Sequence, residues 1–410
     1  MGEMSKEIRS EINSDGLLTL SISSSEIPKP KDHEVLIKVE ASPINPSDLG
    51  LLISFAADVT SLKVEGEGDD KKATMNVHPK LLRTMQARLD KSMQVGNEGA
   101  GVGIDAGKDA TEMIGKTVGV AGGAMYSQYR CIPAQSCLVM HEGTSSKDAA
   151  SSFVNPLTAL GFIETMKMEN HSSLVHTAAA SNLGQMLIKI CLADNIPLVN
   201  IVRKEEHEKL LKGLGATHVC NFTNDNFMES LIDAIAENNA TLGFDATGGG
   251  NEGKLAGQIL SAMETAANRN MKEYSRYGSD TYKQVYIYGG LDPTPTVLNR
   301  SYGLNWGLGG WLLTPFIAKA GNEIFQKMRQ RVADEITTTF ASNYTKEVSL
   351  SEMLDADSIL TYAKQATGEK YLVTPINKTK LESDQLLSLK SVIEKKGSVL
   401  NRSREVSLPV

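Results

Sequence analysis

The sequence has few cysteines, no excess of positive charge and no long apolar run. Its 4 cysteines are scattered over 410 residues, whereas a disulfide framework or a structural zinc site needs closely spaced pairs. No apolar stretch approaches the roughly 20 residues that span a bilayer. The opening MGEMSKEIRS has neither the apolar centre of a signal peptide nor the arginine-rich character of a transit peptide. We therefore expect free buried thiols, no membrane partner and a cytoplasmic location.

The charge balance and the length set further limits. The formal net charge of −7 argues against a general electrostatic grip on nucleic acid or on an anionic membrane. Charged residues make up 22% and apolar residues 41% of the chain, as in an ordinary globular protein. At 410 residues the chain exceeds the size at which one hydrophobic core stops growing, so we expect two domains.

The pattern of the chain changes near Ser151. Before it, short β-type runs such as EVLIKVEASPI alternate with proline and glycine turns. The charged stretch KVEGEGDDKKATMN is expected to be an exposed excursion, and HPKLLRTMQARLDKSM a short helix beside the cleft. After Ser151, apolar strands alternate with helical stretches, which predicts a parallel, doubly wound sheet.

The segment SLVHTAAASNLGQMLIKICLADN joins an apolar strand, a turn of small residues and an amphipathic helix. In a dinucleotide site, such a turn brings the backbone close to the pyrophosphate, and the helix N-terminus supplies partial positive charge. Ala179, Ser181 and Gly184 occupy the three G-x-G-x-x-G positions, so only the last glycine is kept. Tight packing alone would also favour small residues here. The predicted phosphate-binding residues are Ala180, Ser181, Asn182, Leu183 and Gly184.

The next strand, PLVNIV, ends in two cations, Arg203 and Lys204, with His207 one turn further on. A carboxylate at this strand end would pair with the ribose hydroxyls of NAD, whereas cations suit a 2′-phosphate. A solvated helix start, neutralised by the acids that follow, is the alternative interpretation. We predict NADPH as the cofactor. Two later strand ends, in FDATGGG and YIYGG, add the candidates Thr247, Gly248, Gly289 and Gly290.

Taken together, VHTAAASNLG after SSFVNPLTALGF resembles the cofactor-binding core of the medium-chain dehydrogenase/reductase superfamily. The resemblance continues in order through INPSDLGLL, VGNEGAGVG, MYSQYRCIP, FDATGG and TGEKYLVTP, over roughly residues 30 to 376. It implies an α/β protein with a GroES-like β-barrel domain built from both chain ends and a Rossmann domain with a doubly wound parallel sheet. The expected ranges are 1–155 and 320–377 for the first, 156–319 for the second, and 378–410 for a polar tail.

The resemblance also bears on metal and on catalysis. Zinc-dependent members carry Cys where this chain has Asn45 and His where it has Asn97. Neutral amides are poor zinc ligands, so we expect no metal. Asn45 and Thr158 match family positions that line the nicotinamide pocket and are the catalytic candidates, with an Asx turn and a helix-start hydroxyl as the structural alternatives. Glu98, in GNEGAG, is a secondary candidate.

Without a Lewis acid, reduction of an activated C=C or of a quinone is easier than alcohol oxidation. We therefore expect hydride transfer from NADPH to a quinone or enone-type acceptor. An enoyl-thioester (CoA or ACP) reductase is the first alternative, with Arg83 and Arg88 as a basic path for a pantetheine phosphate. Enzymes of that type carry a catalytic tyrosine after NPSD, where this chain has Phe55, and no proton donor is assigned.

A structural or regulatory protein that binds NADPH with little turnover is the other alternative. Relatives of this type generally dimerise through the end of the cofactor domain, so a homodimer is expected. The tryptophans of NWGLGGWLL, Trp306 and Trp311, suit that interface or the wall of the substrate pocket, and we favour the interface.

Overall fold

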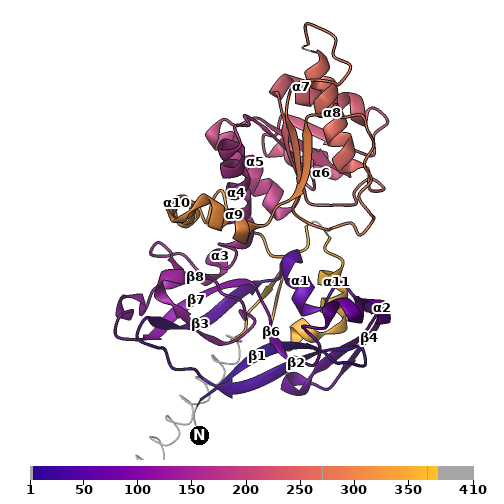
Figure 1. Cartoon of the computed structure of the whole chain (residues 1–410). Helices are drawn as coiled ribbons and strands as arrows, with labels where there is room; N and C mark the ends of the chain where they lie inside the picture. Colours follow the sequence, from indigo (N-terminus) through magenta and orange to yellow (C-terminus); the bar gives the residue numbers. More distant parts are fainter. Residues whose placement is uncertain (1–2, 270, 367, 377–410) are drawn as a thin grey trace, which may run out of the picture.

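The computed structural model describes residues 3–269, 271–366 and 368–376. The tail predicted for residues 378–410 lies outside the described residues. Three β-sheets form two bodies: two mostly antiparallel sheets from the chain ends, and a parallel sheet with its helices from the middle of the chain (Figure 1). None of the helices in the described ranges has the length and apolar character required to cross a membrane.

The first body contains two sheets. The five-stranded sheet has the order β4 (Ala57–Glu65), β5 (Lys72–Val77), β2 (Leu17–Glu26), β1 (Met4–Ile12) and β6 (Met93–Gln94). The other has the order β10 (Cys137–Val139), β8 (Thr117–Ala121), β7 (Glu98–Ala106), β3 (Glu34–Pro43), β18 (Tyr371–Val373) and β17 (Lys346–Val348), with β9 (Tyr129–Pro133) also paired with β3.

Both ends of the chain meet in this second sheet. β18 pairs antiparallel with β3, opposing Leu372 to Pro43 and Val373 to Ser42. Short helices surround the sheets: α1 (Pro46–Leu52), α2 (Pro79–Leu82), α3 (Ser146–Ala149) and α11 (Ala356–Ala363). The GroES-like class predicted from the resemblance is confirmed, while the boundaries at residues 155/156 and 319/320 stay predictions.

The second body is built on a six-stranded parallel sheet. Its order is β13 (His218–Asn221), β12 (Leu198–Val202), β11 (Leu174–His176), β14 (Leu242–Asp245), β15 (Lys283–Ile287) and β16 (Trp306–Gly310). The helices are α4 (Val154–Met168), α5 (Asn182–Asp194), α6 (Glu205–Gly213), α7 (Phe227–Asn238), α8 (Leu255–Arg269), α9 (Leu313–Ala320) and α10 (Asn322–Asp334).

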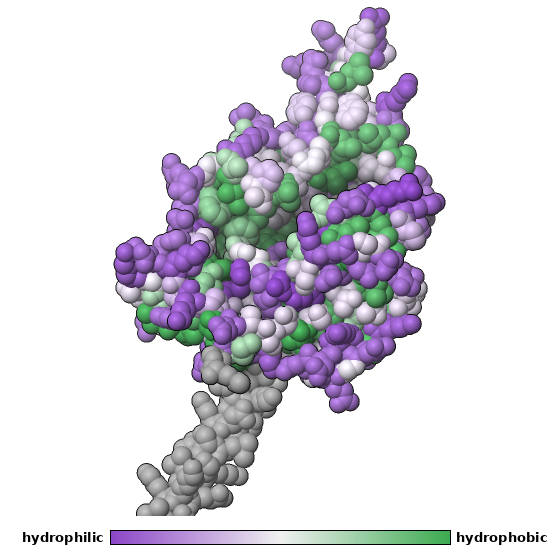
Figure 2. Space-filling view, turned by 60° about the horizontal axis from the view of Figure 1, so that its bottom comes forward, coloured by the Kyte–Doolittle hydropathy of each residue, from purple (hydrophilic) through white to green (hydrophobic). Residues whose placement is uncertain are grey.

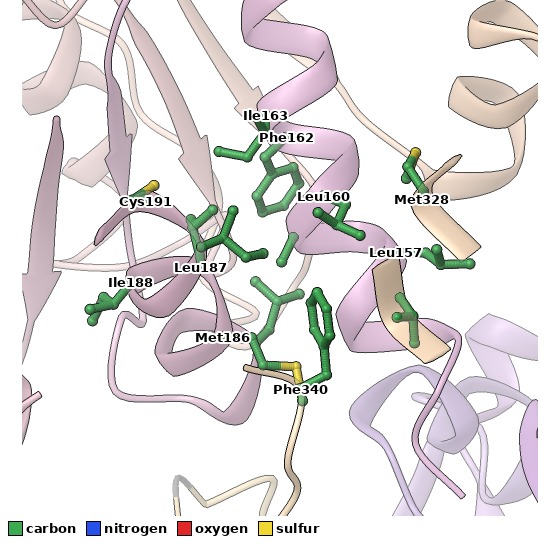
Figure 3. Packing of buried hydrophobic residues seen from close by; sticks show 14 of the residues in the cluster. Leu157, Leu160, Phe162, Ile163, Met186, Leu187, Ile188, Cys191, Met328 and Phe340 are labelled. Carbon is green, nitrogen blue, oxygen red and sulfur yellow. The ribbon is translucent and has the colours of Figure 1, made fainter. Parts of the chain in front are cut away.

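The parallel sheet is buried on both faces, as its uninterrupted apolar strands predict. On one face, Phe162 of α4 and Leu187 of α5 belong to a buried cluster that also contains Phe340 (Figure 3). On the other face, Leu231 of α7 and Ile259 of α8 pack on the strands. Because the strands of this sheet are parallel, their carboxyl ends all lie along the same edge. Open α/β sheets bind their ligands at that edge.

The structure corrects four local predictions. The stretch KVEGEGDDKKATMN is not an excursion but the end of β4 and most of β5, because its alternation buries Ala73 and Met75 while the charges face outward. The helix predicted after it is a single turn, α2, followed by a 3₁₀ turn. Strand β1 was not predicted at the N-terminus, nor was β16 in the glycine- and tryptophan-rich segment.

Candidate functional site

The small-residue turn between β11 and α5 is shaped by close backbone contacts. Ala178 adopts a left-handed conformation, with φ of 49°. Ser181 caps α5, its Oγ accepting a hydrogen bond from the Gly184 amide at 3.2 Å. A Cβ on Gly184 would lie 2.2 Å from the carbonyl oxygen of Ala179, so the helix packs against the turn without space for a side chain. The predicted phosphate-binding residues, Ala180 to Gly184, therefore gather at the N-terminus of α5.

The predicted 2′-phosphate cations follow β12 at the same edge of the sheet. Lys204 lies 3.4 Å from the carboxylate of Glu206, which partly neutralises it, as the helix-start interpretation had allowed. Arg203 is exposed, and no ion pair is recorded for its guanidinium within the part of the chain that the structure describes. Burial lowers the pKa of His207, and the neighbouring Lys204 adds to this shift. Of the three, Arg203 is the cation most available to an anion.

The end of β14 is held by the buried carboxylate of Asp245. Its Oδ1 accepts hydrogen bonds from the Thr177 hydroxyl at 2.7 Å and from the Thr247 hydroxyl at 2.6 Å. Its Oδ2 accepts one from the Gly248 amide at 3.2 Å. Just beyond the next strand, β15, a Cβ at Gly289 would lie 2.5 Å from the Ala246 carbonyl oxygen. The predicted glycines thus serve close approach of two strand ends as well as open space for a ligand.

A loop that the sequence did not predict, residues 292–297, lies across this turn. Cβ atoms at Gly249 and Gly253 would each come within 2.1 Å of a carbonyl oxygen of the loop. The Thr296 hydroxyl donates to the Gly248 carbonyl at 2.7 Å. Hydrogen bonds from Thr294, and further the charge of Arg203, lower the pKa of Asp292 in this loop. The loop therefore brings an acid toward the predicted phosphate-binding arginine.

A buried polar cluster lies in the antiparallel body, around the start of α1. Asn45 caps this helix and is 2% exposed. Its backbone N–H donates to Asp48 Oδ2 at 2.8 Å, and the backbone N–H of Asn97 donates to Asp48 Oδ1 at 2.7 Å. Burial raises the pKa of Asp48 to about 7, although both hydrogen bonds oppose the shift.

Glu98, on β7, connects this cluster to α4. One carboxylate oxygen accepts a hydrogen bond from Asn45 Nδ2 at 2.7 Å. The other accepts from the amides of Phe153 at 2.8 Å and Val154 at 2.9 Å, at the start of α4. Burial raises the pKa of Glu98, while the Lys370 ammonium and these hydrogen bonds oppose the shift. Glu98 therefore links Asn45 to the start of α4, the helix that carries the predicted pocket residue Thr158.

Lys370 is a residue of this cluster that sequence reasoning missed. Its Nζ donates to the Ser151 hydroxyl at 2.8 Å and lies 5.5 Å from the centre of the Tyr344 ring. Burial lowers the pKa of Lys370 to about 8, while the charge of Glu98 opposes the shift. The only sequence signal was its place in TGEKYLVTP, one residue before β18. β18 is far away along the chain but pairs with β3, which leads to Asn45.

An apolar pocket of about 430 Å³ opens at the ends of β15 and β16. Trp311 lines it and donates its indole N–H to the Thr165 hydroxyl at 3.0 Å, so this tryptophan forms pocket wall, one of the two roles that the sequence allowed. Tyr288 also lines it and is fixed by His176, whose Nε2 lies 2.8 Å from the phenol oxygen. Burial lowers the pKa of His176 to about 3, so its ring is neutral. In the space-filling view, hydrophobic residues gather around a hollow, with hydrophilic residues near its rim (Figure 2).

The structure also defines the surroundings of Arg88, Tyr126 and Phe55. Arg88 donates to the carbonyls of Gly50 at 3.1 Å and Leu51 at 2.5 Å, at the end of α1, so its guanidinium is engaged there rather than in a phosphate path. Tyr126 is buried and donates to the Pro43 carbonyl at 3.1 Å. Phe55 is 74% exposed. Across the described ranges, no three His, Cys, Asp or Glu side chains lie close enough together to hold a metal ion.

The comparisons with known proteins agree with this architecture. No protein-family model matches the chain. The mitochondrial enoyl-[acyl-carrier-protein] reductase of Xenopus tropicalis is 27% identical over 219 residues, which are 51% of this chain and 54% of that protein. The Arabidopsis thaliana enzyme of the same name is 33% identical over 108 residues, 25% of this chain and 28% of that protein. The chain thus matches about half or less of the length of these curated relatives.

Solved structures match nearly the whole chain. A putative NADPH:quinone reductase from Mesorhizobium loti has a TM-score of 0.66 at 21% identity, covering 92% of this chain and 99% of its own. An enoyl thioester reductase from Candida tropicalis, in a mutant form, has a TM-score of 0.62 at 15% identity, covering 91% and 100%. The chain therefore has the fold of these reductases, with a GroES-like domain and a Rossmann domain, as the sequence motifs predict.

Proposed function

We propose that this protein is an NADPH-dependent oxidoreductase that transfers hydride to a quinone or an activated, enone-type C=C bond. The observation that carries the proposal is the convergence of the small-residue turn before α5 with three further strand ends at one edge of the parallel sheet. Open α/β sheets bind dinucleotides at this edge. The structural relatives named above include a putative NADPH:quinone reductase, and another is described as an Etr1p complex with NADP and crotonyl-CoA.

The residues present fit the coenzyme. The turn before α5 packs tightly at Gly184, and its backbone amides, with the helix N-terminus, are the groups that would hold a pyrophosphate. Arg203 supplies a planar guanidinium for a 2′-phosphate. Asn45 is buried at the start of α1, where its side chain forms a capping box with Asp48. NADPH, when bound, supplies the hydride; the protein binds and orients it.

We further propose that no zinc takes part. The two amides at the expected zinc-ligand positions are engaged elsewhere: Asn45 Nδ2 with Glu98, and Asn97 Nδ2 with the Ser47 hydroxyl at 3.1 Å. Amide donors also lack the affinity of thiolate and imidazole for zinc. The lining of the pocket, with Trp311, Leu312 and Pro315, suits a flat apolar acceptor.

An enoyl-thioester reductase is the second candidate, favoured by the names of the two curated relatives. Two features weigh against it. Arg88 is engaged with carbonyls of α1, and Phe55 replaces the tyrosine that the resemblance implies for that mechanism. A quinone needs no proton from the protein, because water can protonate its reduced form.

The first prediction concerns turnover. Purified protein mixed with NADPH is expected to oxidise it in the presence of a quinone or an enone, measured as loss of absorbance at 340 nm. Faster turnover with enoyl-CoA or enoyl-ACP would favour the second candidate. Tight NADPH binding without reduction of any acceptor would contradict both enzymatic proposals and favour a binding protein.

The second prediction concerns coenzyme choice. Arg203→Ala is expected to weaken NADPH binding at least tenfold, with little effect on NADH, because one charge-assisted contact to the 2′-phosphate is worth about 1.5–3 kcal/mol. Lys204→Ala is the matched control and should lose less, since Glu206 already partly neutralises Lys204. Titration of the intrinsic fluorescence with both coenzymes measures this. Equal losses for NADPH and NADH would reject the 2′-phosphate role.

The third prediction concerns the turn itself. Gly184→Ala is expected to abolish coenzyme binding and to lower stability by about 1–3 kcal/mol, because its Cβ would overlap the Ala179 carbonyl. Gly213→Ala, at the end of α6, is the control: nothing lies within 4 Å of its Cβ, so it should be neutral or slightly stabilising. Thermal unfolding with and without NADPH distinguishes the two. Normal NADPH binding by Gly184→Ala would argue that the phosphates bind elsewhere.

We also propose a homodimer formed through β16. This strand is at the end of the parallel sheet, paired with β15 on one side. Exposed edge strands pair readily with another chain. Leu304, which is 75% exposed, precedes the strand, and Trp306 packs edge-on against Tyr302 beside it. The edge of β16 thus combines unpaired backbone with apolar surface.

The fourth prediction tests this edge. Leu304→Lys is expected to shift the protein from dimer toward monomer, because burying the charged lysine in the interface costs free energy. Light scattering coupled to gel filtration measures the mass. Leu81→Lys, at an exposed leucine of α2, is the control and should leave the dimer intact. A wild-type protein that is monomeric at micromolar concentration would contradict the proposal.

A further inference from the structure

The pocket at the ends of β15 and β16 is bordered by residues that remain exposed. Leu312 is apolar and lines the pocket, yet it is 64% exposed. Gly310 also lines the pocket and is exposed, and a Cβ at this position would have nothing within 4 Å. A single exposed leucine needs no explanation. Its relation to a second exposed leucine, at the other end of β16, does.

This second leucine is Leu304, which is 75% exposed. Leu304 lies four residues before Leu308, the middle of β16, and Leu312 lies four residues after it. Two copies that pair through the same edge strand about a two-fold axis run antiparallel. Residues at equal distances on either side of the centre then become neighbours. A pair of strands centred on Leu308 therefore sets Leu304 of one copy against Leu312 of the other.

The same register pairs a tryptophan with a glycine. It sets Trp306 of one copy opposite Gly310 of the other, where this chain leaves the space open. An aromatic side chain that covers a glycine of the neighbouring strand helps to fix the register of a sheet. A register shifted by one residue would instead set Leu304 against Leu313, which is buried, or against Trp311, which is hydrogen-bonded within its own chain.

We propose that the acceptor pocket is shared between two copies of this chain. Paired antiparallel through β16 and centred on Leu308, each copy places its Leu304 against Leu312 at the mouth of the other copy's pocket. The apolar wall of the pocket is complete only in the dimer. This inference rests on the proposed homodimer and acceptor site, and it goes beyond them by assigning a residue of the site to the partner.

The backbone around Leu304 is fixed, as such a wall requires. Glu264 forms a buried ion pair with Lys283 at 2.6 Å, and a Cβ at Gly303 would lie 2.8 Å from the same carboxylate. On the other side, the carbonyl of Asn305 accepts a hydrogen bond from the Lys283 amide at 3.2 Å. Leu304 lies between these two anchored residues. A segment that is ordered in advance loses little entropy when it binds.

The fifth prediction tests this register by cross-linking. A variant with both Leu304→Cys and Leu312→Cys is treated with diamide, which oxidises two adjacent thiols to a disulfide. We expect a covalent dimer on a non-reducing gel, because the two positions meet across the two-fold axis. Each single variant is the matched control and should give no covalent dimer, since its two cysteines would lie at opposite ends of the strand pair, roughly 25 Å apart. Untreated and treated wild type control for the native cysteines.

The shared wall should also appear in the kinetics. Leu304→Ala is expected to raise the KM for a quinone about five- to tenfold while the protein is still dimeric, because apolar contact with the acceptor side is lost. The Kd for NADPH should not change. Leu81→Ala, at an exposed leucine of α2, is the control and should change neither value. A Leu304 that only stabilises the dimer would leave the KM of the intact dimer unchanged.

Two outcomes would overturn the inference: a dimeric double-cysteine variant that forms no covalent dimer, or a dimeric Leu304→Ala variant with the wild-type KM. A wild type that is monomeric would refute the proposed homodimer and this inference with it. Absence of acceptor reduction would instead refute the proposed activity, and the cross-link would still test the register.

Discussion

The buried carboxylate of Glu98 is the contact on which the candidate site depends. It is reached by Asn45 from the antiparallel body and by the first amides of α4 from the parallel body. Removing such a group while its partners stay buried costs the full desolvation of every donor left behind. The relative positions of α1 and α4, and with them Asn45 and Thr158, are therefore set by a polar contact rather than by apolar packing alone.

Much of this architecture was predictable from the sequence because it depends on local pattern. Apolar spacing and small residues around Ser181 predict a strand, a turn and a helix, and the structure has β11 and α5 there. The alternation that makes β5 was present as well, but the charges beside Ala73 and Met75 concealed it. Strand β16 was harder, since WGLGG has no alternation and becomes a strand only by pairing with β15.

The remaining features depend on contacts between distant segments. Nothing near Gly249 or Gly253 indicates that residues 294–295 lie on them; the absence of a side chain is meaningful only once that loop is in place. Lys370 reaches Ser151 across 219 positions of the chain. Arg88 looked like a free surface cation, yet its partners are the last carbonyls of α1, a role that a helix end creates and a residue type does not reveal.

The two ends of the proposed coenzyme site differ in how they achieve selectivity. Around Asn45, which the sequence motifs predict beside the nicotinamide, Glu98 and Asn45 are buried, so their charges and dipoles act at short range with little screening. At the proposed adenosine end, Arg203 is exposed and Lys204 is partly neutralised by Glu206. The charge of Arg203 also contributes to the lowered pKa of Asp292. A 2′-phosphate must compete with these acids in water, where salt screens the charge of an exposed arginine. We therefore expect the preference for NADPH over NADH to be moderate and to fall as the ionic strength rises.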